Sequence, residues 1–200
     1  MRDFKQETEA WKFWDAACEA RYQGNEFPYP YILQNRADVI ALCEWIETQA
    51  IRSYLEIGIW SGKLVSLLHS LFQFEKLAVC DLRDADKFGV EIKVPPETLC
   101  FWGDSCSNDY MNWRKNLGEI DLVLIDGAHS LEAVMADFEI NRHYPTRYLA
   151  FHDIGNPRTP DIVRFWNALP GEKWSFCQPF SEPELQDLAP MGIGVWKVPL

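Results

Sequence analysis

Apolar and polar residues form two different patterns along this chain, and the first pattern predicts helices. Over residues 4–22, large side chains recur three or four positions apart with charged residues between them: Trp11, Trp14, Cys18 and Tyr22. This spacing predicts one amphipathic helix that ends near Gly24 and the Pro28/Pro30 segment. Its aromatic side is expected to pack in the core or at a dimer face.

A second helix is predicted to begin after Asn35, because an Asn side chain readily caps the free N–H groups of a first helical turn. The residues of this helix that are expected to face inward are Val39, Leu42, Cys43, Trp45 and Ile46.

From residue 53 onward the apolar residues form short unbroken runs, a pattern typical of strands buried on both faces. The runs are SYLEIGI (53–59), KLAVCDL (76–82), TLCFWGD (98–104), IDLVLIDG (120–127) and RYLAFHD (147–153). Between them lie helix-compatible stretches at Lys63–Phe72, Tyr110–Leu117 and Leu131–Asn141. Strands that alternate with helices predict a mostly parallel sheet. The tail segments KWSFCQPF (173–180) and MGIGVWKV (191–198) predict an antiparallel pair at one sheet edge.

The composition limits the kind of protein. Its 200 residues suit one globular domain, and 48% hydrophobic residues are enough for a full core. The net charge of −11 argues against a nucleic-acid partner that is bound through its backbone charge. The charged start MRDFKQETE has no signal-peptide pattern, and no run of about 18 apolar residues predicts a membrane helix, so a cytoplasmic protein is expected. The six scattered cysteines form no CxxC pair, which predicts reduced thiols.

Acidic residues and glycines stand at the carboxyl end of each predicted parallel strand. In an open α/β sheet these ends meet at one edge, where ligands bind. The residues are Glu56 with Gly58 and Gly62, then Asp81, Asp104, Asp126 and Asp153. We therefore expect the functional site at this edge.

The segment LEIGIWSGKLVSLL predicts a strand that turns through Gly58 and Gly62 into a helix. Its GxxxG spacing differs from the GxGxxG of dinucleotide folds, and no Lys-Ser/Thr pair follows it to hold a phosphate. With Glu56 beside it, the turn suits a ligand that carries an ammonium group; a tight turn without a ligand is the alternative. Asp81 and Asp104 would then suit a ribose diol and an adenine amino group, which together outline an adenosine site.

In this order, the segments LEIGIWSG, CDL, GDS, LIDGAHSLEAVMADFE and FHDIG resemble the class I S-adenosylmethionine-dependent methyltransferases. The stretch DGAHSLEAVMAD…FHD, with RTPDIVRFWNAL and MGIGVWKV nearer the end, is similar to the branch of small-molecule O-methyltransferases of natural-product and sugar pathways. The resemblance covers residues 35–200 and implies one S-adenosylmethionine-binding domain after an N-terminal helical extension, residues 1–34. It also implies a Rossmann-like α/β fold: a seven-stranded, mostly parallel sheet with helices on both faces and an antiparallel C-terminal strand.

The resemblance also implies which residues bind the cofactor. They are Glu56, Gly58, Gly62, Asp81, Asp104, Ser105 and Asp126. The first three would line the methionine part, Asp81 would bind the ribose, and Asp104 with Ser105 would bind the adenine.

Asp126, His129 and Asp153 remain for the acceptor side of the site. Asp126 and Asp153 end neighbouring strands and could share one Mg²⁺, which in metal-dependent relatives lowers the pKa of the acceptor hydroxyl. The sequence departs from that pattern at Ile154, where an Asn or Asp is often the third ligand. Asp126 and His129 are the expected catalytic residues, with His129 as general base; a loop cap or a hydrogen bond to Asp153 are the alternatives for this histidine.

Two further polar residues of these segments are expected to be structural. His152, on a buried strand, is expected to be a satisfied core histidine, and Asp137 to make a structural bond from its helix.

The expected reaction is transfer of a methyl group from S-adenosylmethionine to an oxygen of a small-molecule acceptor. The alternatives are a non-catalytic protein that binds S-adenosylmethionine or S-adenosylhomocysteine, and a non-methylating relative of the fold such as the cephalosporin-hydroxylase-like proteins. A nicotinamide dehydrogenase has the least support, because GxxxG replaces GxGxxG. The first 34 residues and the loops 83–96, 154–160 and 180–190 are expected to shape the acceptor pocket, and Trp11 and Trp14 could serve a homodimer.

Overall fold

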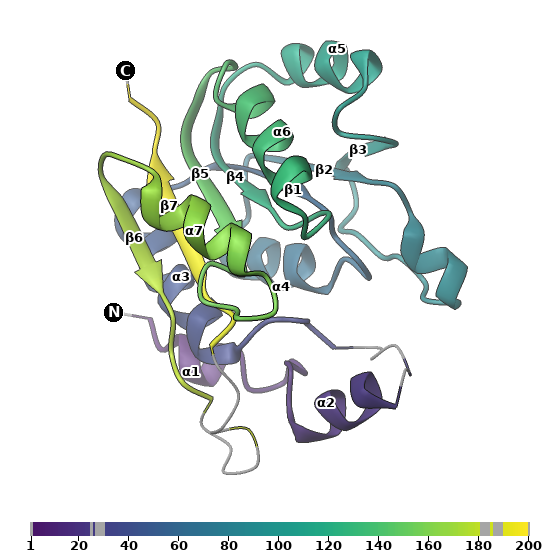
Figure 1. Ribbon diagram of the computed structural model, residues 1–200. Coiled ribbons are helices and arrows are strands. Elements are labelled where there is room, and N and C mark those ends of the chain that lie inside the picture. Colours follow the sequence, from purple (N-terminus) through teal and green to yellow (C-terminus); the bar gives the residue numbers. More distant parts are fainter. Residues whose placement is uncertain (1, 25, 27–30, 181–184, 186–189, 200) are drawn as a thin grey trace.

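A seven-stranded sheet in the order β3-β2-β1-β4-β5-β7-β6 forms the centre of the structure, a computed structural model that describes residues 2–24, 26, 31–180, 185 and 190–199 (Figure 1). The strands are β1 (Ser53–Ile57), β2 (Lys76–Asp81), β3 (Leu99–Trp102), β4 (Ile120–Ile125), β5 (Thr146–His152), β6 (Lys173–Phe176) and β7 (Ile193–Lys197). β7 runs antiparallel to β5 and β6, and the remaining pairs are parallel. The predicted fold class and the antiparallel tail pair are therefore confirmed.

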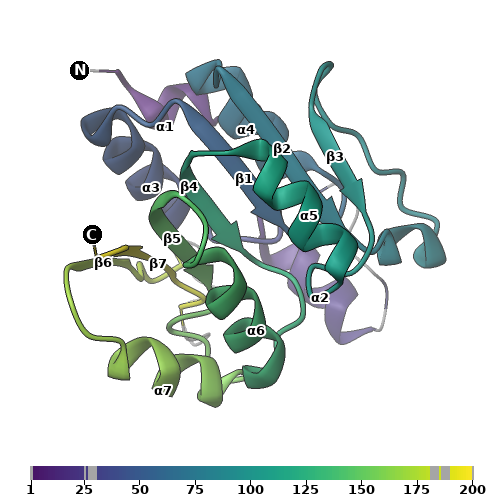
Figure 2. The same cartoon turned by 90° about the horizontal axis from the view of Figure 1, so that it is seen from above.

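Helices cover both faces of this sheet (Figure 2), with α1, α3 and α4 on one face and α5, α6 and α7 on the other. The helices are α1 (Phe4–Glu7), α2 (Ala16–Gln23), α3 (Arg36–Gln49), α4 (Lys63–Phe72), α5 (Asn108–Leu117), α6 (Leu131–Asn141) and α7 (Pro160–Ala168), with a short 3₁₀ helix, η1 (Asp84–Phe88). Along β1, Tyr54 packs in the cluster of the first face, and Leu55 and Ile57 pack in the cluster of the second. This two-sided burial explains the unbroken apolar runs.

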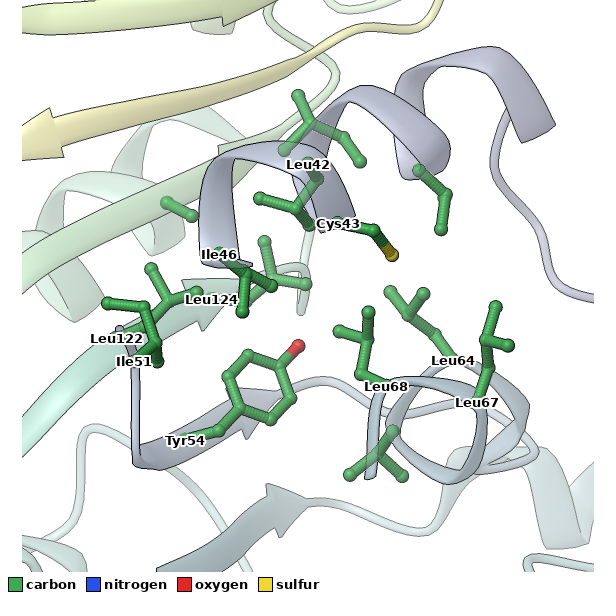
Figure 3. Packing of buried hydrophobic residues seen from close by; sticks show 14 of the residues in the cluster. Leu42, Cys43, Ile46, Ile51, Tyr54, Leu64, Leu67, Leu68, Leu122 and Leu124 are labelled. Atoms are coloured by element: carbon green, nitrogen blue, oxygen red, sulfur yellow. The ribbon is translucent and has the colours of Figure 1, made fainter. Parts of the chain in front are cut away.

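The core on the first face fixes the position of β1. Figure 3 shows Tyr54 of β1 between the apolar side chains of two helices: Leu42, Cys43 and Ile46 of α3, and Leu64, Leu67 and Leu68 of α4. Each such buried Leu or Ile stabilises the fold by about 1.5–3 kcal/mol. β1 is thus held against two packed helices on this face.

The helix predicted after Asn35 is confirmed. The Asn35 side chain accepts a hydrogen bond from the backbone N–H of Ala37, and α3 runs from Arg36 to Gln49. All five residues that were expected to face inward are buried.

The single helix expected over residues 4–22 is wrong, because this segment forms α1 and α2 with a turn and irregular backbone between them. Phe13 makes a parallel β-bridge with Ile32, and the Asp15 side chain accepts from the N–H of Cys18 to start α2. Tertiary pairing of the backbone thus replaces the middle of the helix. Trp14 packs inside its own chain, so the homodimer contact stays a prediction. Pro28 and Pro30, where the predicted helix was expected to end, lie outside the described residues.

Burial on both faces does not extend to β3, which was expected to be as buried as its neighbours. Leu99 and Trp102 are exposed, because β3 is the edge strand of the sheet. All six cysteines are free thiols, as predicted. Across the described ranges, none of the helices has the length and apolar character needed to cross a membrane.

Candidate active site

A cavity of about 420 Å³ opens at the carboxyl ends of the parallel strands, within the range of about 300–1,000 Å³ that small-molecule sites occupy. Most of the predicted site residues line it together: Glu56, Gly58, Asp81, Asp104, Ser105, Asp126 and His129. Gly62 and Asp153, which are also in the described part of the chain, do not line the cavity. Strands far apart in sequence thus bring most of the predicted set to one place.

The turn after β1 is tight because it lies directly on the end of β4. Gly58 has a φ of +82°, and a Cβ at this position would lie 2.3 Å from the carbonyl oxygen of Asp126. Gly62 has a φ of +76°, and its Cβ would lie 2.2 Å from the carbonyl oxygen of Lys93. Glycine is therefore required at both positions by backbone contacts, and a direct role of Gly62 with a ligand stays a prediction.

Asp81 closes the turn from the side of β2. Its Oδ2 accepts a 2.8 Å hydrogen bond from the N–H of Ile59, and its Oδ1 accepts from the N–H of Arg83. Burial raises the pKa of this carboxyl, while the backbone donors work in the opposite direction. A carboxylate offers about four lone-pair sites, so Asp81 retains room for a diol.

Asp104 and Ser105 lie beside a third polar residue, Asp137 of α6. Asp104 is exposed, and its Oδ1 accepts a 2.8 Å hydrogen bond from the N–H of Cys106. Asp137 is buried and lines the same cavity. Burial raises the pKa of its carboxyl to about 6, and a hydrogen bond from Ser105 works in the opposite direction. Its Oδ1 has no hydrogen-bond partner in the described part of the chain. The expected structural bond exists, but it uses only part of this carboxyl.

Asp126, at the end of β4, is the most heavily engaged carboxylate of the site. Its Oδ1 lies 3.0 Å from Nδ1 of His152 and 3.3 Å from Nε2 of His129. Its Oδ2 accepts a 2.6 Å hydrogen bond from Nε2 of Gln34. Burial works to raise the pKa of Asp126, but His152 and His129 together outweigh it and hold the pKa below its usual range. Asp126 is therefore an anion.

His129 bridges two carboxylates. Besides Asp126, it places Nδ1 3.0 Å from Oδ2 of Asp153. Hydrogen bonds to Asp126 and Asp153 raise the pKa of His129 to about 10, against the effect of burial. Asp153 has a φ of +64°, which is rare for a residue with a side chain and typical of functional sites. His129 is thus protonated at neutral pH in the free protein.

His152 differs from the satisfied core histidine that was expected. It is buried, and although Nδ1 lies close to Asp126, neither ring nitrogen has a partner with hydrogen-bond geometry within the described residues. The atoms with which Asp126, His129 and His152 could bind a metal all lie within 4.8 Å of one another. Ile154 is buried in the apolar cluster on the second face of the sheet, so it supplies no ligand.

Sequence reasoning missed Gln34 as a site residue and placed His152 and Asp137 outside the site. For His152 and Asp137 a signal existed, because they lie next to Asp153 and on the helix that follows Asp126. Gln34 precedes α3 and meets Asp126 only through the fold. Of the loops expected to shape the acceptor pocket, residues 181–184 and 186–189 lie outside the described residues.

Comparison with known proteins shows the family and the fold of the chain. Residues 55–154, half of the chain, match the family described as "Methyltransferase domain", and no curated protein matches the sequence significantly. A cofactor-bound protein from MTB is 16% identical, with 92% of this chain and 88% of that chain covered and a TM-score of 0.61. The O-methyltransferase from Bacillus cereus, in complex with SAH, is 13% identical, with 98% and 96% covered and a TM-score of 0.56. TomG from Streptomyces achromogenes, an O-methyltransferase of tomaymycin synthesis in complex with SAM, is 14% identical, with 99% of each chain covered and a TM-score of 0.56. At these identities the structural likeness shows a shared fold.

Proposed function

Because the chain belongs to the methyltransferase-domain family, its reaction is methyl transfer, and we propose that it moves the methyl group of S-adenosylmethionine to an oxygen of a small molecule. The observation that carries this proposal is the cavity into which the β1 turn and the acids after β2, β3 and β4 all face. S-adenosylmethionine or its product is bound in solved proteins of this fold, among them the Bacillus cereus O-methyltransferase and TomG.

The cavity offers a separate place for each part of this cofactor. Asp81 would accept from the ribose hydroxyls, and Asp104 with Ser105 would meet the adenine one strand further along the sheet. The Gly58 turn and Glu56 would border the methionine part beside β4. The sulfonium methyl would then lie near Asp126, where an acceptor can approach from the side of the histidines.

Methyl transfer is an in-line displacement. The acceptor oxygen forms a bond to the methyl carbon while the carbon–sulfur bond breaks, and its electron pair stays on sulfur to give S-adenosylhomocysteine. The acceptor proton must leave, and His129, which lines the cavity beside Asp126, is the candidate base. Since the pKa of His129 is raised to about 10, it acts as a base only in alkaline solution or when one neighbouring carboxylate is neutralised.

A divalent cation fits the residues on this side of the cavity. The buried Nε2 of His152 lacks a hydrogen-bond partner among the described residues, and Asp126, His129 and His152 each offer one ligand atom within 4.8 Å of the others. Asp126 and Asp153 would hold Mg²⁺ as the resemblance implies, whereas two imidazoles favour a transition-metal ion. A bound cation would supply charge that lowers the pKa of the acceptor hydroxyl.

The decisive test is release of S-adenosylhomocysteine across a panel of phenols, sugars and hydroxylated metabolites. His129→Ala should keep its affinity for S-adenosylhomocysteine and lose turnover by about 10²–10⁴-fold, the usual cost of removing a general base. Asp126→Asn should also lose turnover. His143→Ala, at an exposed histidine at the end of α6, is the matched control and should behave like the parent.

The test also separates the alternatives. A parent protein that binds the cofactor but methylates nothing in a broad panel would favour a non-catalytic binding protein or a non-methylating relative. Turnover that survives both substitutions would place the catalytic groups elsewhere. We further propose a cytoplasmic location and a homodimer.

A further inference from the structure

Gln34 joins the segment before α3 to the end of β4. Its Nε2 donates a 2.6 Å hydrogen bond to Oδ2 of Asp126, 92 residues away in sequence. The backbone holds this segment in place, since the N–H of Ile32 donates to the carbonyl of Lys12 at 2.7 Å and the N–H of Trp14 donates to the carbonyl of Gln34 at 3.3 Å. The Gln34 side chain is only 5% exposed, so the fold fixes where its amide lies.

The bond to Asp126 decides which end of the Gln34 amide is the oxygen. Nε2 of Gln34 donates to Oδ2 of Asp126, whose Oδ1 lies within 3.3 Å of a ring nitrogen of both His129 and His152, and a carboxylate can only accept hydrogen bonds. The amide atom that contacts it must therefore be the NH₂ group. The other atom, Oε1, is buried and has no hydrogen-bond partner in the described part of the chain. An acceptor in this position is available to a donor from a ligand or a water.

Gln34 and the two histidines engage opposite oxygens of Asp126. His129 and His152 lie at Oδ1, on the side where the proposed acceptor would react, and Gln34 lies at Oδ2. Gln34 also lines the cavity together with Glu56 of β1, the strand paired with β4. Gln34 therefore borders the part of the cavity that the methionine end of the cofactor would occupy.

Only one donor of S-adenosylmethionine suits that place. Its ribose hydroxyls and adenine amino group are assigned to Asp81 and Asp104, which follow β2 and β3 on the far side of β1 from β4. The donor that remains is the α-ammonium group. A cation is also favoured electrostatically here, because the Asp126 carboxylate borders the same space as Glu56, a carboxyl that can ionise when a cation binds beside it.

We infer that Gln34 is a cofactor-binding residue, whose side-chain oxygen accepts a hydrogen bond from the α-ammonium group of S-adenosylmethionine while its nitrogen orients Asp126. The inference rests on the proposed function. It assigns to the segment before α3 a direct part in recognising the amino-acid end of the cofactor.

The test is titration calorimetry of the full chain with three ligands: S-adenosylhomocysteine, its analogue that lacks only the α-amino group, and 5′-methylthioadenosine, which lacks the whole amino-acid end. Gln34→Met keeps the length of the side chain and removes its hydrogen bonds. We expect this variant to bind S-adenosylhomocysteine about 10- to 100-fold more weakly than the parent does, the loss of one hydrogen bond to a charged group. Its affinities for the other two ligands should stay within about twofold of those of the parent. Gln73→Met, at an exposed glutamine after α4, is the matched control.

The ligand pattern separates this inference from a structural role. Equal losses for S-adenosylhomocysteine and its deaminated analogue would overturn the inference and leave the proposed function standing, as would unchanged affinity for all three ligands. A parent that binds neither S-adenosylhomocysteine nor 5′-methylthioadenosine would overturn both. If Gln34→Met does not fold, as judged by its thermal unfolding, Gln34→Asn tests the same ligand pattern with an amide that is one methylene too short.

Discussion

The hydroxyl of Tyr54 donates a 2.7 Å hydrogen bond to Oε2 of Glu56, a carboxyl that is buried in the wall of the cavity. The two residues lie two positions apart on β1, so their side chains share one face of the strand. Burial raises the pKa of Glu56 to about 8, although the bond from Tyr54 lowers it. At neutral pH the free protein therefore holds a protonated carboxyl where the cofactor's cationic end would lie.

The raised pKa makes folding stability depend on pH. Between the usual value of 4.5 and about 8, the folded state keeps the Glu56 proton that the unfolded state loses. The contribution of protonated Glu56 to folding stability is complete below pH 4.5, the usual pKa of the group in the unfolded state. It is lost progressively as the pH rises to about 8, the pKa in the folded state. Glu56→Gln cannot ionise, so its free energy of unfolding relative to the parent should rise between pH 5 and 8, by up to about 1.4 kcal/mol for each pH unit.

Urea unfolding of both proteins at pH 5, 7 and 9 measures this difference. Glu44→Gln, at an exposed position of α3, is the control and should follow the parent at every pH. If the Glu56→Gln curve also runs parallel to that of the parent, then Glu56 is not protonated in the folded protein.

The raised pKa of Glu56 also predicts that cofactor binding releases a proton. An ammonium group close to Glu56 favours the carboxylate, so binding of S-adenosylhomocysteine at pH 7 should expel a proton, and affinity should rise from pH 6 to 8. Calorimetry in phosphate and in Tris should give different binding heats for the parent and the same heat for Glu56→Gln. A difference that persists in the variant would assign the proton to another group, such as Asp137.

Much of the fold could be predicted because its determinants are local. The start of α3 follows from one cap at Asn35, and the alternation of strands with helices is readable from apolar runs. The helix expected over residues 4–22 failed because Phe13 pairs with Ile32, a contact that local spacing does not encode. The exposure of Leu99 on β3 was missed for a similar reason, since an edge strand is defined by the order of the sheet.

The residues of the candidate site also fall into those that local sequence predicts and those that only the fold brings together. Residues that follow strands were found because parallel strands end at one edge, and Glu56, Asp81 and Asp126 do line one cavity. Gln34 was missed because its role depends on a contact with Asp126, 92 residues away in the sequence. The burial of Asp137 could not be predicted either, because periodicity alone does not show which face of α6 borders a cavity.

Gly58 provides a test of the turn itself. Alanine there would have a Cβ 2.3 Å from a backbone oxygen of Asp126, whereas the same change at Gly89, which also has a positive φ of +70°, meets nothing within 4 Å. Gly89→Ala should cost about 1–2 kcal/mol of unfolding free energy for its backbone conformation alone. Gly58→Ala should cost more unfolding free energy than Gly89→Ala and should also weaken the binding of S-adenosylhomocysteine. Equal unfolding free energies for the two variants would contradict the close approach of the β1 turn to β4.

Asp81 should bind the ribose of any adenosine ligand. Asp81→Asn keeps the shape of the side chain but replaces an acceptor with a donor, and we expect about 30- to 150-fold weaker binding, or roughly 2–3 kcal/mol. Because 5′-methylthioadenosine has the same ribose, it should lose as much affinity as S-adenosylhomocysteine. Asp109→Asn, at an exposed residue of α5, is the control. Unchanged affinity for both ligands would rule out the ribose assignment.

The last prediction concerns the cation. A divalent ion that binds only the folded protein raises the melting temperature as its concentration increases. Because Asp126, His129 and His152 combine one carboxylate with two imidazoles, Mn²⁺ should stabilise the protein at lower concentrations than Mg²⁺. Asp126→Asn should abolish the rise for both ions, and Asp109→Asn should keep it. An equal rise in Asp126→Asn would place the ion elsewhere, and no rise in the parent would contradict the cation site at Asp126, His129 and His152.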